Sequence, residues 1–270
     1  MGKLYIGNSG STPAIIKVEE VPKVKFGASV DTWIGNVDAN GVLNQSTWTG
    51  VLDFAGVKEI GTNGLGYAFY RCMGLTSVDL SSLQSVGTGG LLSAFQDCLT
   101  LTRVDLSSLT SVGTNGMSHA FRSCLKLTSI DLSSLTSVDM YGINYVFYDC
   151  TELTSVNLSS LTTIDKYGLQ YGFCGCTRLT RVDLSSLTSV DANGLTNVFY
   201  NCSKLTTISF PSLTDVQTNS FGSSTSNGAF RNCTALTEIH FRADMQATIE
   251  AISQYANKWG ATNATIYFDL

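Results

Sequence analysis

One cysteine recurs along this chain at a fixed interval of 26 residues. Its positions are Cys72, Cys98, Cys124, Cys150, Cys176 and Cys202, and Cys233 follows after 31 residues, so one repeat carries a five-residue insertion. A fixed period of this length is typical of proteins built from stacked structural repeats. Such proteins work through an extended surface and not through a deep catalytic pocket.

The residues around each cysteine follow one apolar pattern. Leucine stands three residues after the cysteine, Val or Ile six residues after it, and Leu or Phe eight residues after it. Polar residues alternate with the apolar residues at positions six and eight, which predicts a short strand with this apolar pair facing inward. Before the next cysteine, as in residues 143–147, apolar residues at i, i+3 and i+4 predict about one turn of helix. Each repeat is therefore expected to run from strand to bend, second short strand and helical return.

A glycine column lies just before the predicted helical turn. Its members are Gly90, Gly116, Gly142, Gly168 and Gly194. We expect a tight bend there that requires positive φ, which glycine adopts without steric cost.

The two ends of the chain depart from the repeat. Residues 46–241 hold the repeats, and residues 1–45, with β-favouring runs at 3–6, 14–18 and 24–26, predict an N-terminal β cap or attachment segment. Residues 242–270 predict a C-terminal helix–strand cap. Its helix is expected to begin at Asp244 as N-cap and to reach about Lys258, with a final strand at 265–268.

The cysteines themselves predict packing and not chemistry. Parallel side chains in one column rarely offer the Cβ geometry of a disulfide, so a ladder of buried free thiols is expected. Cys174 lies outside the column and is predicted to be the accessible thiol. Its spacing to Cys176 makes a poor zinc site without further ligands, so neither a metal nor a cofactor is predicted.

Composition narrows the classes of partner. Charged residues make up 14% of the chain, below the roughly 25% of ordinary soluble domains, and the net charge is −5. Without a Lys/Arg cluster the chain is not expected to bind nucleic acid. An apolar run of 18 residues or more is missing, so membrane insertion is not expected either. The first residues lack the apolar segment of a secretory signal.

The motif Ala-Phe-x-x-Cys-x-x-Leu-Thr-x-Val-x-Leu resembles the BspA-like class of bacterial leucine-rich repeats over about residues 52–241. The period is longer than in the shorter repeats of that class, and its usual proline survives only as Pro211. Pattern and resemblance predict an α/β repeat protein, a right-handed leucine-rich-repeat solenoid of about 26-residue turns with terminal caps. The resemblance implies a non-enzymatic binding or adhesion protein of bacteria.

The N-terminal flank carries a second resemblance. Residues 3–8 and 26–43 resemble the openings of phage or prophage tail-associated proteins of gut bacteria, which leave the cell without a signal peptide. The expected location is therefore extracellular, at the cell surface or on a virion.

Aromatic residues gather in three outward columns of the repeat, 17, 21 and 24 residues after the cysteine. With the two basic residues that share these columns, the candidate ligand-binding residues are Tyr67, Tyr70, His119, Arg122, Tyr141, Tyr145, Tyr148, Tyr167, Tyr171 and Tyr200. Tyrosine combines a large contact area with a polar tip, which suits recognition of a protein or carbohydrate surface. The alternative is that these rings only cover the apolar edges of neighbouring repeats.

The strand columns carry a ladder of carboxylates. Asp79, Asp105, Asp131, Asn157 and Asp183 share one position, and Asp139, Asp165 and Asp191 share another. Arg103 and Arg181 are expected to neutralise part of the first set. Calcium between adjacent turns is the alternative, although each site offers few ligands.

Catalysis finds little support in the sequence. The two histidines, His119 and His240, stand in different columns, and neither a nucleophile elbow nor a P-loop occurs. The chain is therefore predicted not to be an enzyme. Two functions remain: binding or adhesion at a bacterial or host cell surface, or a structural spacer or shaft module in a phage tail or surface assembly.

Overall fold

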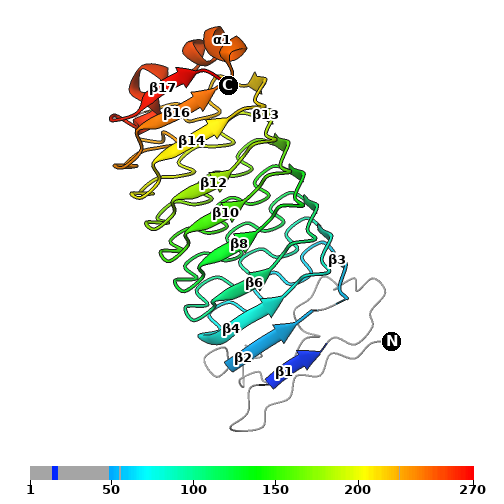
Figure 1. The fold of residues 1–270 in the computed structure, drawn as a ribbon. Coiled ribbons are helices and arrows are strands. Elements are labelled where there is room, and N and C mark those ends of the chain that lie inside the picture. Colours follow the sequence, from blue (N-terminus) through cyan, green and yellow to red (C-terminus); the bar gives the residue numbers. More distant parts are fainter. Residues whose placement is uncertain (1–13, 18–48, 55, 225) are drawn as a thin grey trace.

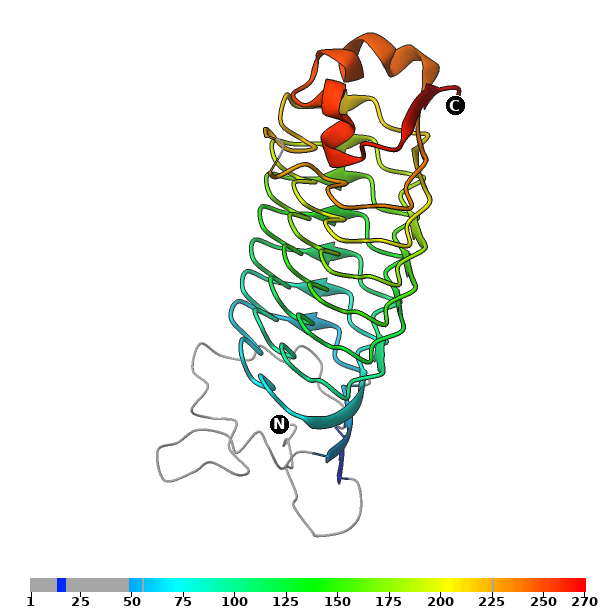
Figure 2. The ribbon, with the colours of Figure 1, turned by 90° about the vertical axis from the view of Figure 1, so that its left-hand side faces the viewer.

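The computed structural model describes residues 14–17, 49–54, 56–224 and 226–270. They form an elongated solenoid in which parallel strands stack turn upon turn along one axis (Figures 1 and 2). The register repeats every 26 residues, since Ser155 pairs with Ser129 on one side and with Arg181 on the other. The predicted leucine-rich-repeat solenoid is thus confirmed.

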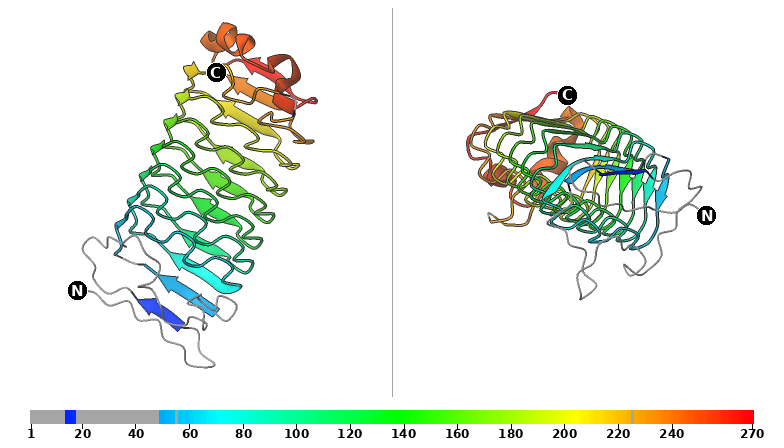
Figure 3. Two further views of the ribbon diagram at one scale, coloured as in Figure 1. Left: turned by 180° about the vertical axis from the view of Figure 1, so that it is seen from behind. Right: turned by 90° about the horizontal axis from the view of Figure 1, so that it is seen from below.

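Two ladders of parallel strands run along the solenoid. The first holds β1 (Ala14–Lys17), β2 (Thr49–Asp53), β4 (Gly74–Asp79), β6 (Arg103–Asp105), β8 (Ser129–Asp131), β10 (Ser155–Asn157), β12 (Arg181–Asp183), β14 (Thr207–Phe210), β16 (Glu238–Phe241) and β17 (Thr265–Phe268). The second is one seven-stranded sheet of β3 (Glu59–Ile60), β5 (Ser85–Val86), β7 (Ser111–Val112), β9 (Ser137–Val138), β11 (Thr163–Ile164), β13 (Ser189–Val190) and β15 (Asp215–Val216). Figure 3 shows the row of longer strands from behind. We call the outward side of the first ladder the strand face.

The inward columns fill one continuous core. Leu127, Ile130 and Leu132 are buried, as the shared pattern requires. The phenylalanine three residues before each cysteine adds a column of nearly parallel rings, with adjacent centroids 5.3–5.8 Å apart. Rings at this distance attract one another beyond the effect of burial. Because every column crosses the boundaries between repeats, no repeat buries its apolar face alone.

The cysteine column is the predicted ladder of buried free thiols. Each described Sγ after the first donates to a phenylalanine carbonyl of the preceding repeats, as from Cys150 to Phe121 at 3.2 Å. Burial raises the pKa of these thiols, that of Cys72 to about 12. The prediction for Cys174 is wrong: it is buried beside Tyr148, and burial raises its pKa to about 12 as well.

The segment before each cysteine is not the predicted helix. In residues 113–123, taken as the example, amides alternate between two acceptors: Ala120 donates back to Met117 at 3.0 Å, and Phe121 donates forward to Val146 of the next repeat at 3.0 Å. Every fourth residue is left-handed, with φ of 54° at Asn115, 56° at His119 and 59° at Ser123. A run of tight turns with period four produces the same i, i+3, i+4 spacing as a helix. We call this stretch the turn segment.

The glycine column also differs from its prediction, because positive φ occurs at other glycines and not at these five. The constraint is space. A Cβ on Gly116 would lie 2.8 Å from the Gly113 carbonyl oxygen and 2.8 Å from a Val112 methyl group. Glycine is therefore needed at this position, because the chain passes close to its own carbonyl groups where the second ladder ends and the turn segment begins.

The C-terminal residues cover the last repeat with three short helical pieces and not with one helix. They are η3 (Ala243–Met245), α1 (Gln246–Ala251) and η4 (Tyr255–Gly260), followed by β17 at the predicted strand. Ile252 is extended and Gln254 is left-handed with φ of 66°, which breaks the predicted helix. Asp244 pairs with the Arg242 guanidinium and caps no helix. Trp259 is fully buried and packs on Phe221 with ring centroids 4.8 Å apart.

At the N-terminal end, β1 pairs in parallel with β2, Ala14 opposite Gly50. The predicted strands at 3–6 and 24–26 and both phage-like flanks lie outside the described residues. Among the described residues, no helix combines the length and the apolar character that a membrane span requires.

Candidate functional site

The ten candidate residues lie on the outward side of the turn segments, which we call the turn face. Five of its tyrosines have left-handed backbones, with φ between 53° and 59°: Tyr67, Tyr141, Tyr145, Tyr167 and Tyr171. Such a backbone is uncommon for a bulky residue and costs about 1–2 kcal/mol. Asparagine tolerates it better, and Asn193 holds the same position as Tyr167 one repeat later. The turn face therefore presents aromatic rings at a cost to the backbone.

The rings of the turn face form two stacks. His119, Tyr145 and Tyr171 make one stack, with centroid distances of 4.6 Å at both steps and interplanar angles of 7° and 14°. Tyr141 and Tyr167, four residues earlier in their repeats, make a second at 4.8 Å. The spacing matches the distance between hydrogen-bonded strands, so the backbone repeat places the rings.

Cationic side chains lie over several of these rings. The predicted site residues Arg122 and Tyr148 meet in this way, with the guanidinium carbon 4.8 Å from the ring centroid. The other pairs are Arg71 on Tyr70, Lys166 on Tyr167 and Arg231 on Tyr200, at 5.0, 5.5 and 5.0 Å. Contacts of this kind are worth about 0.5–1 kcal/mol at exposed sites. They hold the ring edges in place along the turn face.

Two rings of the longer stack, His119 and Tyr145, are neutral near pH 7. Burial, with a smaller effect of Arg122, lowers the pKa of His119 to about 4. Burial, and then the neighbouring Tyr171, raises the pKa of Tyr145 to about 12. Both rings therefore offer stacking surface and neutral hydrogen-bonding groups.

A depression of about 750 Å³, open to solvent, lies on the turn face near its N-terminal end. It is lined by Tyr67, Tyr70, Leu92, Ser93, Gln96, Asn115, Ser118, His119, Arg122, Tyr141 and Asn144. Half of the ten predicted residues are in this set. The others, Tyr145, Tyr148, Tyr167, Tyr171 and Tyr200, lie outside it in later repeats. Two smaller depressions, of about 460 and 280 Å³, lie on the strand face.

Sequence reasoning missed the polar part of this lining. Ser93 and Gln96 stand where the aromatic columns are interrupted, and their small or flexible side chains leave the depression open. Asn144 is 8% exposed, and its Oδ1 lacks a hydrogen-bond partner in the described structure. The sequence does carry one signal of this polar lining: Ser93 interrupts the aromatic column between Tyr67 and His119.

The acidic ladder of the strand face serves local structure. The carboxylate of Asp131 accepts the amide of Ser133 at 2.9 Å, and the same contact recurs in neighbouring repeats. Side chains of this type close Asx turns after a strand. Arg103 and Arg181 lie 3.5 and 3.7 Å from Asp105 and Asp183, as predicted.

The described residues do not form a site for the alternative, a calcium ion between adjacent turns. They contain no group of three or more His, Cys, Asp or Glu side chains arranged to hold a metal ion. In the second carboxylate set, Asp165 accepts the amide of Lys166 at 2.6 Å, which again is a local turn contact.

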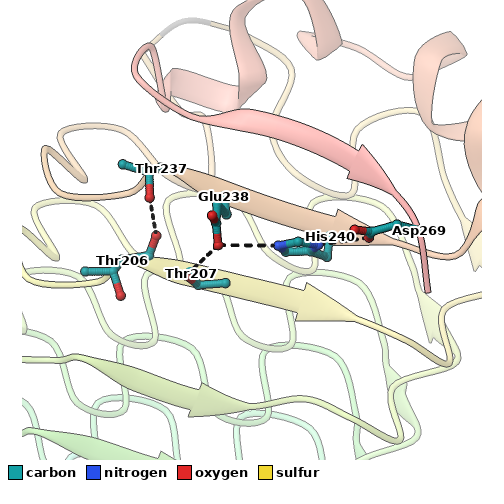
Figure 4. Close-up of polar contacts among 6 residues, drawn as sticks. All are labelled: Thr206, Thr207, Thr237, Glu238, His240 and Asp269. Carbon is teal, nitrogen blue, oxygen red and sulfur yellow. Dashed lines mark hydrogen bonds and ion pairs between the residues drawn. The ribbon is translucent and has the colours of Figure 1, made fainter.

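His240 lies near the C-terminal end of the strand face in a small polar cluster (Figure 4). Its Nδ1 is 2.9 Å from an Asp269 oxygen and its Nε2 is 3.6 Å from a Glu238 oxygen. The Thr207 hydroxyl contacts Glu238 at 3.4 Å and not the imidazole. His240 also stacks on Tyr267 at 4.9 Å. The cluster thus ties β16 to the last residues of the chain.

Comparison with known proteins agrees with this geometry. The model of the BspA type leucine-rich repeat region matches six copies over residues 58–193 and 94–227. Solved structures with similarity include a leucine-rich repeat protein of T. pallidum, at 25% identity over 61% of this chain and 80% of that chain, with a TM-score of 0.33. Another is from Bacteroides ovatus, at 19% identity over 83% of this chain and 79% of that chain, with a TM-score of 0.23. No curated protein matches the sequence significantly.

The family assignment depends on the repeat model, because both TM-scores are low. That model covers more than half of the chain, and its repeats coincide with the stacked turns. Proteins of this kind generally mediate protein interaction or adhesion and are generally not enzymes. In bacteria they are typically associated with the surface. The chain belongs to the BspA-type leucine-rich repeat family.

Proposed function

We propose that this chain is a binding or adhesion module that recognises a protein or glycan at a bacterial or host cell surface through the turn face. One observation carries the proposal: this face presents stacked tyrosine rings on left-handed backbones. Strain of this kind persists where the surrounding structure enforces it and is concentrated at functional sites. The location that follows is extracellular, on a cell or a virion.

The protonation states of His119 and Tyr145 support recognition and not acid–base catalysis. His119 has a lowered pKa and Tyr145 a raised one, so neither group exchanges protons near pH 7. Tyrosine rings give contact area at low entropic cost and keep a polar tip for hydrogen bonds.

A rigid spacer or shaft module in a phage tail or surface assembly is the second candidate, because the repeats are also tied by threonines. The Thr136 hydroxyl donates to the Thr110 carbonyl at 3.0 Å, and Thr162 donates to Thr136 at 2.9 Å. Further ties of this kind lie along the same column and along a second one through Thr154. Such ties stiffen a shaft without recognising a partner.

Binding to an array of glycans and matrix proteins tests the choice. We expect the purified chain to bind at least one array member, and Tyr145→Ser with Tyr171→Ser to lower the affinity at least tenfold. Serine is compatible with this backbone, since Ser93 has φ of 51° at the equivalent position. Loss of the stacked rings should cost about 1–3 kcal/mol of stability, which leaves the fold intact for the measurement.

The matched control is Tyr267→Ser, which removes a tyrosine that is 39% exposed on the strand face. It should leave binding unchanged. Binding to no array member, or equal loss with both variants, would count against the turn face and favour the spacer.

A further inference from the structure

The longer ring stack is interrupted at one repeat. Its column reads Tyr67, Ser93, His119, Tyr145 and Tyr171, and all five residues have φ between 51° and 59°. Serine thus shares the backbone of its neighbours but brings no ring. Ser93 is 3% exposed and lines the depression of about 750 Å³, so it lies at the floor of this part of the depression, which we call the recess.

The interruption has the width of one ring. Tyr67 donates its amide to Leu92, and Ser93 donates to Ser118, which places Tyr67, Ser93 and His119 in three successive turns. The stack advances 4.6 Å per turn, so the backbone positions of Tyr67 and His119, two turns apart, are about 9 Å apart, and the Tyr67 ring packs edge-on against Tyr70 with centroids 6.5 Å apart. Since carbon atoms of packed groups approach to about 3.5–4 Å, one ring fits between them. Both flanking residues line the depression of about 750 Å³.

The rim of this recess is polar and lacks carboxylates. Gln96, Asn115 and Ser118 line it with amide and hydroxyl groups, and no Asp or Glu is among the described residues of the lining. These groups both donate and accept hydrogen bonds, which favours a ligand that does the same.

We propose that the recess at Ser93 is a saccharide subsite, which takes one pyranose ring of a glycan between Tyr67 and His119. A sugar ring offers apolar C–H faces to both flanking rings. Around its edge it carries hydroxyl groups that can donate to and accept from the Gln96 and Asn115 amide groups. This inference depends on the proposed function, because it names the ligand class of the same face.

An aromatic side chain of a protein partner fits the recess less well. A Phe, Tyr or Trp side chain fills the gap between the rings but carries at most one polar atom, and a His carries two. Most of the rim would then lose water without gaining a hydrogen bond, at a cost for each group. The polar rim therefore favours the saccharide.

Filling the gap tests the subsite. Ser93→Tyr places in this repeat the residue that the same backbone carries at Tyr145 and Tyr171, so we expect it to fold with an unchanged or higher urea midpoint. The probes are hexasaccharides of β-linked glucose, mannose, N-acetylglucosamine and galacturonic acid, with binding measured by saturation-transfer NMR and calorimetry. Wild type should bind at least one of them, and Ser93→Tyr should lower that affinity at least tenfold.

Two controls distinguish the effect of filling the gap from other effects of a substitution. Ser93→Gly keeps the gap and tolerates the left-handed backbone, so its affinity should stay within threefold of wild type. Ser155→Tyr adds the same ring on the strand face and should leave binding unchanged. If Ser93→Tyr does not fold, Tyr67→Ser removes an exposed flanking ring instead and should lower the affinity at least fivefold.

The outcomes distinguish the subsite from the function of the face. Suppose that Ser93→Tyr keeps its saccharide affinity while the variant with Tyr145→Ser and Tyr171→Ser loses it. That result would overturn the subsite but would still support binding by the turn face. Binding to matrix proteins with none to the saccharides also overturns the subsite and leaves the face. Binding to neither class overturns both.

Discussion

At the scale of single residues, the cysteine column shows how a repeat turns a reactive side chain into a packing element. Each thiol of the column occupies the same buried position, and from Cys98 onward its Sγ donates to a carbonyl group at 3.0–3.3 Å. Burial disfavours the thiolate, which raises the pKa of Cys72 and Cys233 to about 12. Because the thiolate is the nucleophile, these groups are inert near pH 7.

The thiol column predicts unfolding in alkali. A thiol whose pKa is raised in the folded state stabilises the fold fully below its ordinary pKa of 9.0, the value it has in the unfolded chain. That stabilisation is lost as the pH rises toward the folded value, by about 1.4 kcal/mol per pH unit and thiol. For eight buried thiols the loss by pH 10 is about 10 kcal/mol, comparable with the whole stability of a domain. Urea midpoints should therefore fall steeply above pH 9.

The control is Cys98→Ala with Cys150→Ala, whose urea midpoint should depend less steeply on pH. A thiol-specific chromogenic reagent should label no column cysteine of the native protein at pH 8 and all of them in denaturant. Rapid native labelling, or a midpoint that stays constant to pH 10.5, would contradict the buried ladder.

At the scale of elements, the sequence predicts the strands well and the turn segment poorly. The alternation around Ile130 and Leu132 identifies a strand because only the period-two pattern buries both residues. The spacing in residues 143–147 is ambiguous, since a helix and a run of four-residue turns both bury i, i+3 and i+4. The bonds that decide between them go to the next repeat, as from His119 to Asn144. No pattern within one repeat reveals such partners.

The glycine column offers a test of this element. Gly116→Ala should destabilise the protein by about 2–3 kcal/mol, because its Cβ would meet backbone and a valine methyl group at 2.8 Å. Gly61→Ala is the matched control: nothing lies within 4 Å of its Cβ, so a change within about 0.5 kcal/mol is expected. Urea unfolding of both variants measures the difference. Equal effects would show that close packing does not explain the column.

At the scale of the whole molecule, the repeat gives two outward faces with different chemistry. The strand face carries threonine ties such as that of Thr154 to Thr128, Asx turns, and ion pairs such as that of Arg103 with Asp105. The turn face carries the ring stacks and the larger of the described depressions. The columns of the sequence predicted which residues share a face. They did not predict the recess at Ser93, because its depth depends on the register of three successive turns.

The most direct test of the turn face is an NMR spectrum of the protein with ¹³C-labelled tyrosine rings, recorded with and without the bound array member. The chain has eleven tyrosines, and Tyr267 on the strand face is the internal reference. The account predicts shifts of the Tyr67, Tyr70, Tyr141, Tyr145 and Tyr171 ring signals with Tyr267 unchanged. Shifts confined to Tyr267, with the turn-face signals unmoved, would contradict it.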